Sequence, residues 1–383
     1  MTGKPAPVVL RKNLARAIRD GHPWIFRDAV EPPGPLPDGA LVEVRARSGR
    51  PLAAGYWSAD SPIAVRVLEP GPLPDVRGTL EERVRAALRR RLERLDLART
   101  NAFRWVHGEA DRLPGVHVDL YDDVAVLRFD GAGAAAFYRD LGGVLAGARP
   151  LRSALDRQSG KLLQGAALPG ELWAKENGLW FEVSPGAGGK GGLFLDQREN
   201  RELVESRAEG RTVLDLFGST GGFSLYAARG GARSTDTVDT ARPALASARR
   251  NFERNGLPLE TARFHAADAF EFLEAARGRR WDLVVSDPPS FAPRKSARPA
   301  ALRAYRRLHR LAAAATAPGG LLLAASCSSH FGRDEFVETL LAGAREAGRR
   351  FEPEDVRGPG FDHPSLPSFP EGDYLTFAAG RVR

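Results

Sequence analysis

Cysteine and methionine are nearly absent from this chain of 383 residues, which contains one of each. A single cysteine, Cys327, excludes an internal disulfide framework and any site built from several cysteines, so we expect no structural metal. Long apolar runs are also missing, because the most apolar stretch, residues 311–325, is interrupted by Pro318-Gly319-Gly320. It falls short of the ~20 residues of a membrane span. Residues 1–10 lack the apolar centre of a signal peptide, so we expect a cytoplasmic protein without a membrane partner.

Lysine is scarce as well, since six of the 56 basic residues are lysine and the rest are arginine. The net charge of +8 fits a polyanionic partner such as RNA. An arginine-rich composition also follows from a GC-rich genome, so the total charge leaves both explanations open and its distribution must decide. The length exceeds that of one ordinary core, and we expect two or three domains.

Residues 213–223 predict a buried strand, a glycine-rich turn and the start of a helix. Gly218 and Gly221 allow the backbone to approach a ligand where a Cβ atom would clash. Asp239 ends the next predicted strand, 24 residues after Asp215. That spacing is close to the one at which an acidic side chain meets the ribose hydroxyls of a nucleoside cofactor.

Two features of this turn favour S-adenosylmethionine over NAD. The pattern is Asp-Leu-Phe-x-x-x-Gly-Gly-Phe rather than Gly-x-Gly-x-x-Gly. An acidic residue precedes the glycines, and its charge would repel a pyrophosphate but attract the ammonium group of a methionine moiety. The stretch resembles motif I of the class I S-adenosylmethionine-dependent methyltransferases. The resemblance implies cofactor contacts for Asp215, Phe217, Gly218, Gly221 and Asp239.

Predicted strands and helices alternate from residue 213 onward, which indicates a parallel sheet in a doubly wound α/β fold. Ligands bind such sheets beyond the carboxyl ends of the strands. The predicted strands are 213–217, 234–239, 262–266, 282–286 and 320–326, and the predicted helices are 222–230, 242–255, 269–277 and 299–316. The strand ends carry Asp215, Gly218, Asp239, Asp268, Asp287 and Cys327, and we expect Asp268 and Asp287 to contact the cofactor too.

Asp287 and Cys327 are the candidates for catalysis. Asp287 opens an Asp-Pro-Pro turn, whose prolines remove competing backbone donors. A lone cysteine is more often a core filler, but Cys327 follows a predicted strand and is flanked by serines, which favours a nucleophile. A thiolate that adds to carbon 6 of a pyrimidine makes carbon 5 nucleophilic. A carboxylic acid at ring nitrogen 3 assists that addition to cytosine, a role that fits Asp287.

The first 70 residues predict short alternating strands, among them 41–45 and 63–67, that fit a small β-barrel. The segments 22–26 and 39–44 resemble a PUA domain, which is a small RNA-binding β-barrel. A barrel without a ligand would show the same strand pattern, so RNA binding by this part rests on the resemblance.

Residues 103–185 predict a second small unit of the order strand–strand–helix–strand–strand. The helix is expected over 132–146, and Asn177-Gly178 predicts a hairpin turn between the last two strands.

Residues 194–201 predict the start of a further helix. Gln197 and Arg198 would lie at its N-terminus, where they could clamp a carboxylate of the cofactor. The same residues also fit an ordinary charged helix start.

Residues 292–310 carry basic side chains and no acidic residue. A segment of one charge sign beside the proposed base pocket fits a track for RNA phosphates. Arg294, Lys295 and Arg298 are its candidate RNA contacts.

Several motifs follow one another in a characteristic order. They are the PUA-like start, Phe-Leu-Asp-Gln-Arg at 194–198, the turn at 215–223, Asp-Pro-Pro-Ser-Phe at 287–291, Ser-Cys-Ser at 326–328 and the closing segment 362–375. In this order the chain resembles the bacterial family of large-subunit (23S) ribosomal RNA cytosine-5 methyltransferases with an N-terminal PUA domain. The resemblance implies S-adenosylmethionine as cofactor, a flipped cytosine as substrate and 5-methylcytidine formation through a covalent bond to Cys327.

Three domains are expected on this basis. They are a PUA-like β-barrel at 1–74, a middle α/β domain at 75–187 and a Rossmann-like class I methyltransferase domain at 188–383. A guanine N7 or N2 methyltransferase on the same fold remains an alternative, because attack by a guanine nitrogen needs no thiol. A non-catalytic RNA-binding protein is a second alternative, although intact Asp215, Asp239 and Asp287 argue against it. The sequence leaves open whether the chain forms a homodimer.

Overall fold

The computed structural model describes residues 5–168, 170–185, 193–292, 295–328 and 331–383. These residues divide into two compact units. Unit 1 contains the described residues of 1–177 together with Pro185 and residues 361–372. Unit 2 contains residues 178–184, the described residues of 193–360, and residues 373–383. No helix within the described ranges is long and apolar enough to span a bilayer.

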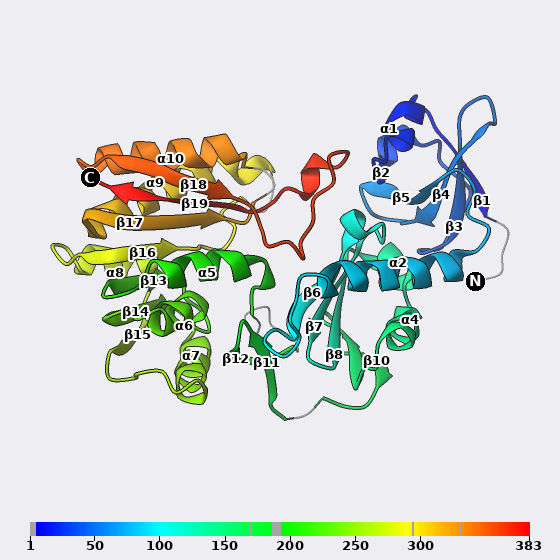
Figure 1. The fold of residues 1–383 in the computed structure, drawn as a ribbon. Helices are drawn as coiled ribbons and strands as arrows, with labels where there is room; N and C mark the ends of the chain where they lie inside the picture. Colours follow the sequence, from blue (N-terminus) through cyan, green and yellow to red (C-terminus); the bar gives the residue numbers. More distant parts are fainter. Residues whose placement is uncertain (1–4, 169, 186–192, 293–294, 329–330) are drawn as a thin grey trace. The chain divides into compact units, whose positions relative to one another are not determined.

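The first sheet of unit 1 has five short strands in the order β1-β3-β4-β5-β2 (Figure 1). Val42 and Val44 are buried while their neighbours in β3 are more exposed, as the period of a half-covered strand requires. β1 pairs with β3 in parallel, and the other neighbours are antiparallel. The strands are β1 (Ala6–Val9), β2 (Trp24–Phe26), β3 (Leu41–Arg45), β4 (Pro51–Trp57) and β5 (Ile63–Pro70), with helix α1 (Ala15–Arg19) and the 3-10 turn η1 (Arg27–Ala29) between them.

The second sheet of unit 1 has the order β10-β9-β8-β7-β6. Its elements are α2 (Val76–Leu92), β6 (Ala102–His107), η2 (Gly108–Asp111), β7 (Val116–Tyr121), β8 (Val124–Phe129), α3 (Ala132–Phe137), α4 (Leu141–Ala148), β9 (Ser153–Asp156) and β10 (Leu162–Gly165). Arg91 of α2 is buried and donates to both oxygens of Asp111, at 2.7 Å each. This bidentate ion pair joins the helix to the loop that follows β6.

The structure differs from the predicted middle unit in three respects. The helix expected over 132–146 is two helices, α3 and α4, because Tyr138 and Asp140 leave the helical conformation and the glycines at 142 and 143 weaken the helix that follows. β6 and β10 extend the sheet to five strands, although no alternating pattern predicted them. The predicted hairpin, β11 (Leu172–Glu176) and β12 (Leu179–Val183), forms a separate two-stranded sheet.

Unit 2 is built on a seven-stranded sheet of the order β15-β14-β13-β16-β17-β19-β18, with helices on both faces (Figure 1). The first five of these strands are parallel, and β19 runs antiparallel to β17 and β18. The strands are β13 (Thr212–Leu216), β14 (Ser234–Asp239), β15 (Ala262–Ala266), β16 (Trp281–Ser286), β17 (Thr316–Ser326), β18 (Phe351–Arg357) and β19 (Thr376–Val382). The helices are α5 (Arg198–Ser206), α6 (Gly222–Arg229), α7 (Arg242–Arg254), α8 (Ala269–Ala275), α9 (Arg298–Ala315) and α10 (Arg333–Glu346).

The central strands β13, β16 and β17 of this sheet are buried on both faces, which is why they contain continuous apolar runs. Leu214 and Val284 lie in one core with α8, α9 and α10. Val213 and Val285, the neighbours of these residues along each strand, lie in the other core with α5 and α6. The predicted doubly wound α/β fold is confirmed, and every predicted element between 213 and 326 is present within a few residues of its expected bounds.

Residues 361–372, here called the return segment, follow β18 in sequence but belong to unit 1. Asp362 is buried there, and its Oδ2 atom accepts a hydrogen bond from the backbone N–H of Arg104 at 2.9 Å. Its carbonyl oxygen accepts a second bond from Arg91 at 2.7 Å. The Phe369 ring packs edge-on against Trp24 of β2, with centroids 4.6 Å apart. The return segment is thus an integral part of the core of unit 1.

Candidate active site

A cavity of about 680 Å³ opens at the carboxyl ends of the parallel strands of unit 2. This is the edge at which ligands bind doubly wound sheets. The predicted site residues that line it are Gln197, Phe217, Gly218, Asp239, Asp268, Asp287 and Cys327. Three predicted cofactor residues, Arg198, Asp215 and Gly221, do not line it among the described residues. The strand topology therefore brings most of the predicted set to one place.

The glycine-rich turn after β13 has a strained backbone. Phe217 and Ser219 both have positive φ angles, 61° and 48°, which non-glycine residues rarely adopt. A Cβ atom on Gly218 would come within 2.5 Å of the Thr237 side chain, so this position requires glycine. Asp239 at the end of β14 accepts the backbone N–H of Ser219 at 3.1 Å and thereby holds the turn in place.

The Asp215 side chain stabilises the glycine-rich turn through hydrogen bonds to Ser224. This side chain is fully buried, and Oδ2 accepts the N–H and the hydroxyl of Ser224 at 3.0 and 2.8 Å. Burial raises the pKa of Asp215 to about 7, although the two bonds from Ser224 oppose that shift. The carboxyl group therefore joins β13 to the start of α6. A direct contact between Asp215 and the cofactor stays a prediction.

Asp268 has a clear local role in addition to lining the cavity. It is the N-cap of α8 and accepts the backbone N–H groups of Phe270 and Glu271, at 2.8 and 3.2 Å. The cap fixes the start of α8 and brings Phe270 to the cavity wall. The sequence predicted the position of Asp268 but not the aromatic ring beside it.

Asp287 leaves β16 and enters the cavity, where its Oδ2 atom accepts the Gln197 side-chain amide at 3.0 Å. Burial raises the pKa of Asp287 to about 7, with smaller contributions from the negative charges of Asp196 and Asp215. A substantial fraction of Asp287 is therefore a neutral acid near pH 7. That is the state in which a carboxyl group can donate a proton or a hydrogen bond.

Cys327 follows β17 and is partly buried in the cavity wall, with its Sγ atom 4.0 Å from the carbonyl oxygen of Pro288. Burial raises the pKa of the thiol to about 12, and the charges of Asp287 and Asp196 add to the shift. The protein alone thus keeps Cys327 in the thiol form. Asp287 and Cys327 line one cavity, as the sequence predicted, at the exits of adjacent strands β16 and β17.

Sequence reasoning missed two charged residues of the cavity wall, Asp196 and Arg201. Asp196 accepts the Tyr374 hydroxyl at 2.8 Å, and Arg201 donates to the carbonyl oxygen of Phe194 at 2.9 Å. Arg198, the predicted clamp, is buried away from the cavity, and Arg201 lines it one turn later. The motif at 194–198 correctly indicated that this helix start belongs to the site. Which arginine lines the cavity depends on the rotation of α5 about its axis.

The basic segment is partly neutralised by neighbouring helices. Arg298 at the start of α9 pairs with Glu335 of α10 at 2.6 Å, and Arg307 pairs with Glu274 at 2.8 Å. Arg294 lies outside the described residues, and Lys295 begins the 3-10 turn η4 (Lys295–Ala297). The three candidate RNA contacts stay predictions. These acidic partners lie outside the segment in sequence, so the composition of the segment alone could not reveal them.

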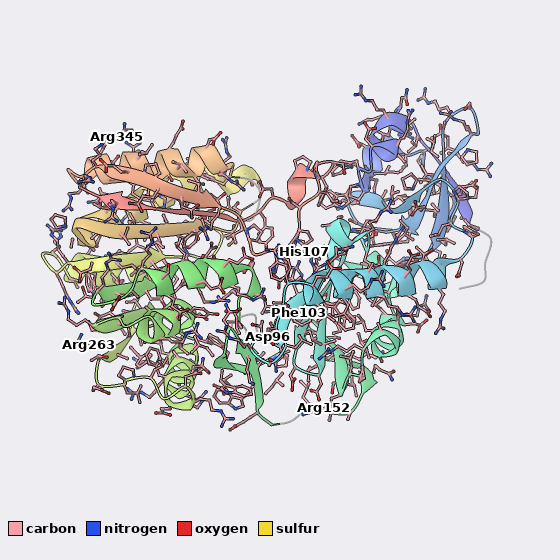
Figure 2. The ribbon with its side chains drawn as sticks, viewed as in Figure 1. Asp96, Phe103, His107, Arg152, Arg263 and Arg345 are labelled. Atoms are coloured by element: carbon pink, nitrogen blue, oxygen red, sulfur yellow. The ribbon has the colours of Figure 1, made fainter. Side chains whose placement is uncertain are left out.

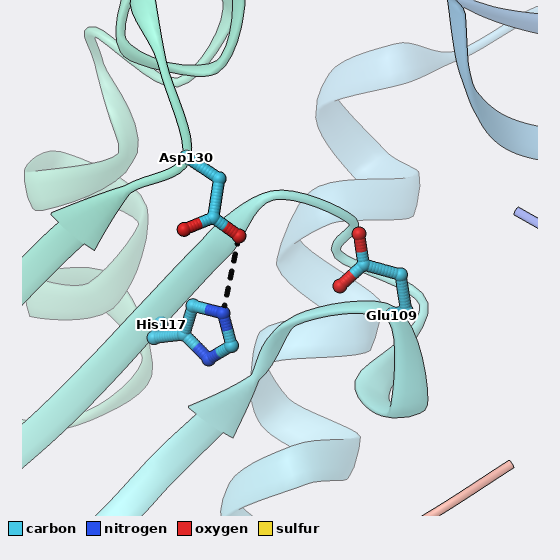
Figure 3. A group of neighbouring side chains, drawn as sticks. All are labelled: Glu109, His117 and Asp130. Atoms are coloured by element: carbon cyan, nitrogen blue, oxygen red, sulfur yellow. Dashed lines mark hydrogen bonds and ion pairs between the residues drawn. The ribbon is translucent and has the colours of Figure 1, made fainter. Parts of the chain in front are cut away.

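Glu109, His117 and Asp130 of unit 1 form the one group within the described ranges whose side chains could surround a metal ion, with their ligand atoms within 4.8 Å (Figure 3). His117 Nε2 lies 3.3 Å from Asp130, and Glu109 accepts the Trp24 indole N–H at 2.7 Å. The buried Arg66 guanidinium lies 3.9 Å from Glu109. This arginine already balances carboxylate charge, so the arrangement favours an ion-pair network over a cation site.

His107, labelled in Figure 2, belongs to the same polar interior of unit 1. Its ring lies edge-on to those of His117 and His363, with centroids 5.3 and 5.1 Å away. Burial, together with the neighbouring His363 and Arg104, holds the pKa of His107 well below its ordinary value. His107 and His117 are therefore neutral near pH 7 and pack as part of the core rather than as a reactive site.

Comparisons with known proteins agree with this geometry. Residues 151–367 match the family model of S-adenosylmethionine-dependent methyltransferases, and residues 8–70 match a PUA-like domain. A ribosomal RNA large subunit methyltransferase of Deinococcus radiodurans is 38% identical over 96% of both chains. Ribosomal RNA large subunit methyltransferase I of Pseudoalteromonas translucida is 33% identical over 96% of this chain and 97% of its own length. A crystal structure of a methyltransferase with bound SAH has the same fold, with a TM-score of 0.85 and 23% identity over 99% of this chain and all of its own.

Proposed function

We propose that this chain, which belongs to the family of S-adenosylmethionine-dependent methyltransferases, methylates carbon 5 of a cytosine in large-subunit (23S) ribosomal RNA. Relatives that cover nearly the whole chain carry the name of ribosomal RNA large subunit methyltransferases, which supports this RNA as substrate. The observation that carries the choice of cytosine is the pairing of one thiol and one weakly acidic carboxyl group, Cys327 and Asp287, in the walls of one cavity.

The donor set of the cavity fits S-adenosylmethionine. Asp239 uses its two oxygens to accept the backbone N–H groups of Ser219 and Ala241. A carboxylate offers about four lone-pair positions, so it can also accept ribose hydroxyls. Phe217 and Phe270 offer apolar surface to an adenine ring. When bound, S-adenosylmethionine supplies an electrophilic methyl group.

Cys327 and Asp287 divide the chemistry of the base between them. The Cys327 thiol gives up its proton to solvent, and its sulfur forms a bond to carbon 6 of cytosine while Asp287 gives its proton to ring nitrogen 3. The electron pair of the 5,6 double bond then becomes available at carbon 5, which would take the methyl group with S-adenosylhomocysteine as the leaving group. Loss of the carbon-5 proton to solvent and release of the thiolate from carbon 6 restore the aromatic ring. Asp287 regains the proton of nitrogen 3 and the thiolate takes up a proton from solvent, so the enzyme ends in its starting state.

One observation keeps the guanine alternative in view. The raised pKa of Cys327 means that the thiolate must form after the site is loaded, whereas attack by a guanine nitrogen needs no thiolate. In that case the Asp287 turn would hold the base, and Cys327 would only fill the cavity wall. Replacing Cys327 separates the two reactions, because only the cytosine reaction requires the sulfur atom.

The decisive experiment uses large-subunit ribosomal RNA that contains 5-fluorocytidine. Fluorine at carbon 5 cannot leave as a proton, so the wild-type protein should remain bound to RNA through a band that survives denaturing electrophoresis. Cys327→Ala should give no such band and no methyl transfer, but should still bind S-adenosylmethionine in calorimetry. Peptide mapping should place the RNA on Cys327, the single thiol of the chain. Methylation by Cys327→Ala at the wild-type rate would overturn the cytosine-5 proposal.

A further inference from the structure

Two consecutive hydrogen bonds connect the buried side-chain amide of Asn200, through that of Gln197, to Asp287. Asn200 Nδ2 donates to Gln197 Oε1 at 2.5 Å, and Gln197 Nε2 donates to Asp287 Oδ2 at 3.0 Å. Gln197 is 2% exposed and Asn200 is 1% exposed. The two residues lie three positions apart at the start of α5, which brings their side chains together on one face of the helix.

This arrangement differs from what a helix start needs for its own stability. Gln197 is the N-cap of α5, but its side chain makes no capping hydrogen bond. Serine, threonine or aspartate would serve that purpose better. Instead, the amide lines the cavity and bonds to a residue 90 positions away in sequence. Burying a polar amide is costly unless it is hydrogen-bonded, and the bond to Asp287 offsets that cost for Gln197.

The direction of these bonds has a chemical consequence for Asp287. An amide nitrogen only donates and an amide oxygen only accepts. While Gln197 Nε2 faces Asp287, the Oδ2 atom must be an acceptor, and the proton of the neutral acid must be on Oδ1. Cytosine nitrogen 3 is an acceptor, whereas uracil nitrogen 3 carries a hydrogen. An Asp287 that presents a donor through Oδ1 therefore matches cytosine and mismatches uracil.

We propose that Gln197 and Asn200 are positioning residues that select cytosine over uracil by fixing which oxygen of Asp287 carries the proton. The inference rests on the proposed cytosine-5 function and deepens it. Asn200 determines the orientation of the Gln197 amide, and Gln197 determines the proton position on Asp287. If the Gln197 amide were turned around, its Oε1 atom would face Asp287. This reversed hydrogen-bond direction requires a proton on Oδ2 and leaves Oδ1 as the acceptor that uracil needs.

The variant Asn200→Asp is designed to reverse the direction of these hydrogen bonds. An ionised carboxylate at position 200 only accepts, so in that state Gln197 must turn its nitrogen toward it and its oxygen toward Asp287. We expect cytosine methylation to fall at least tenfold in kcat, and the ratio of 5-methyluridine to 5-methylcytidine to rise on matched RNAs with uridine or cytidine at the target position. Gln197→Met keeps the length of the side chain without its hydrogen bonds, and should lower kcat while leaving selectivity weaker rather than reversed.

Glu202→Gln is the matched control, because residue 202 is exposed on the same helix. It should leave kcat and the product ratio unchanged. Calorimetric binding of S-adenosylmethionine by all variants shows that the site has folded. An unchanged kcat and product ratio in Asn200→Asp would overturn the inference.

A second measurement is independent of which base is methylated. The Gln197 bond lowers the pKa of Asp287. Titration of the Asp287 side-chain carboxyl carbon by NMR should therefore move to higher pH in Gln197→Met than in wild type. An unshifted titration refutes the link between Gln197 and Asp287. A shifted titration in a protein that forms no 5-fluorocytidine adduct would instead refute the cytosine-5 function while the link stands.

Discussion

The state of the Cys327 thiol can be tested directly, because it is the single cysteine in the chain. Burial, followed by the charges of Asp287 and Asp196, raises its pKa to about 12. An ordinary thiol with a pKa of about 8.5 is ~10% thiolate at pH 7.5. With a pKa of about 12, the thiolate fraction is smaller by roughly 3,000-fold, since each pKa unit is a factor of ten.

Alkylation with iodoacetamide, followed by intact-protein mass spectrometry, measures this fraction because the thiolate is the nucleophile. The rate should rise about tenfold per pH unit from pH 7 to pH 10 without a plateau. Limited access to the sulfur lowers all rates together and leaves this slope unchanged. Cys327→Ala gives the background. A rate that levels off near pH 7 would refute the reasoning, because it would show a thiolate already present in the free protein.

A second variant tests whether the charge of Asp287 contributes to the raised pKa of Cys327. Asp287→Asn removes a negative charge that raises the thiol pKa, so alkylation should become faster between pH 7 and pH 10, where Asp287 is ionised. Asp334→Asn is the control, because Asp334 is exposed in the first turn of α10. Equal rates in these two variants would mean that Asp287 does not act on the thiol, and would weaken its proposed place beside the reacting base.

Three further outcomes are expected. Asp239→Ala should weaken S-adenosylmethionine binding tenfold or more in calorimetry, because a charge-assisted hydrogen bond contributes ~1.5–3 kcal/mol; an unchanged affinity would remove Asp239 from the site. Asp111→Ala should lower the free energy of unfolding of unit 1 by ~3–5 kcal/mol in urea and hydrogen-exchange measurements, since Arg91 would stay buried without its carboxylate. RNA affinity should fall steeply with salt, and Arg298→Ala should reduce the log–log slope by about one if Arg298 contacts a phosphate.

The sequence was most informative where one physical signal dominates. Strands such as β13 and β16 are buried on both faces, so their apolar runs and intervening helix patterns located them within a few residues. Because parallel strands end at one edge of a sheet, the positions of Asp287 and Cys327 followed from that topology alone. The PUA-like start was also recognised correctly from its short motifs.

The sequence was less informative where the answer depends on side-chain direction or on distant partners. The position of Arg201 in the cavity, in place of Arg198, depends on the rotation of α5. Tyr374 holds Asp196 across 178 residues of sequence, and no local pattern carries that information. The edge strands β6 and β10 were missed because β6 is buried at nearly every position and β10 is largely exposed, so neither alternates.

The return segment affects the order in which the protein can fold during synthesis. Domains generally fold as units, with the N-terminal one first. Unit 1 cannot follow that rule completely, because Arg91 and the backbone of Arg104 bond to Asp362, 271 and 258 residues later. The ribosome must synthesise every strand of unit 2 except β19 before residues 361–372 emerge. Unit 1 therefore cannot complete its core until residues 361–372, which are synthesised near the end of the chain, become available.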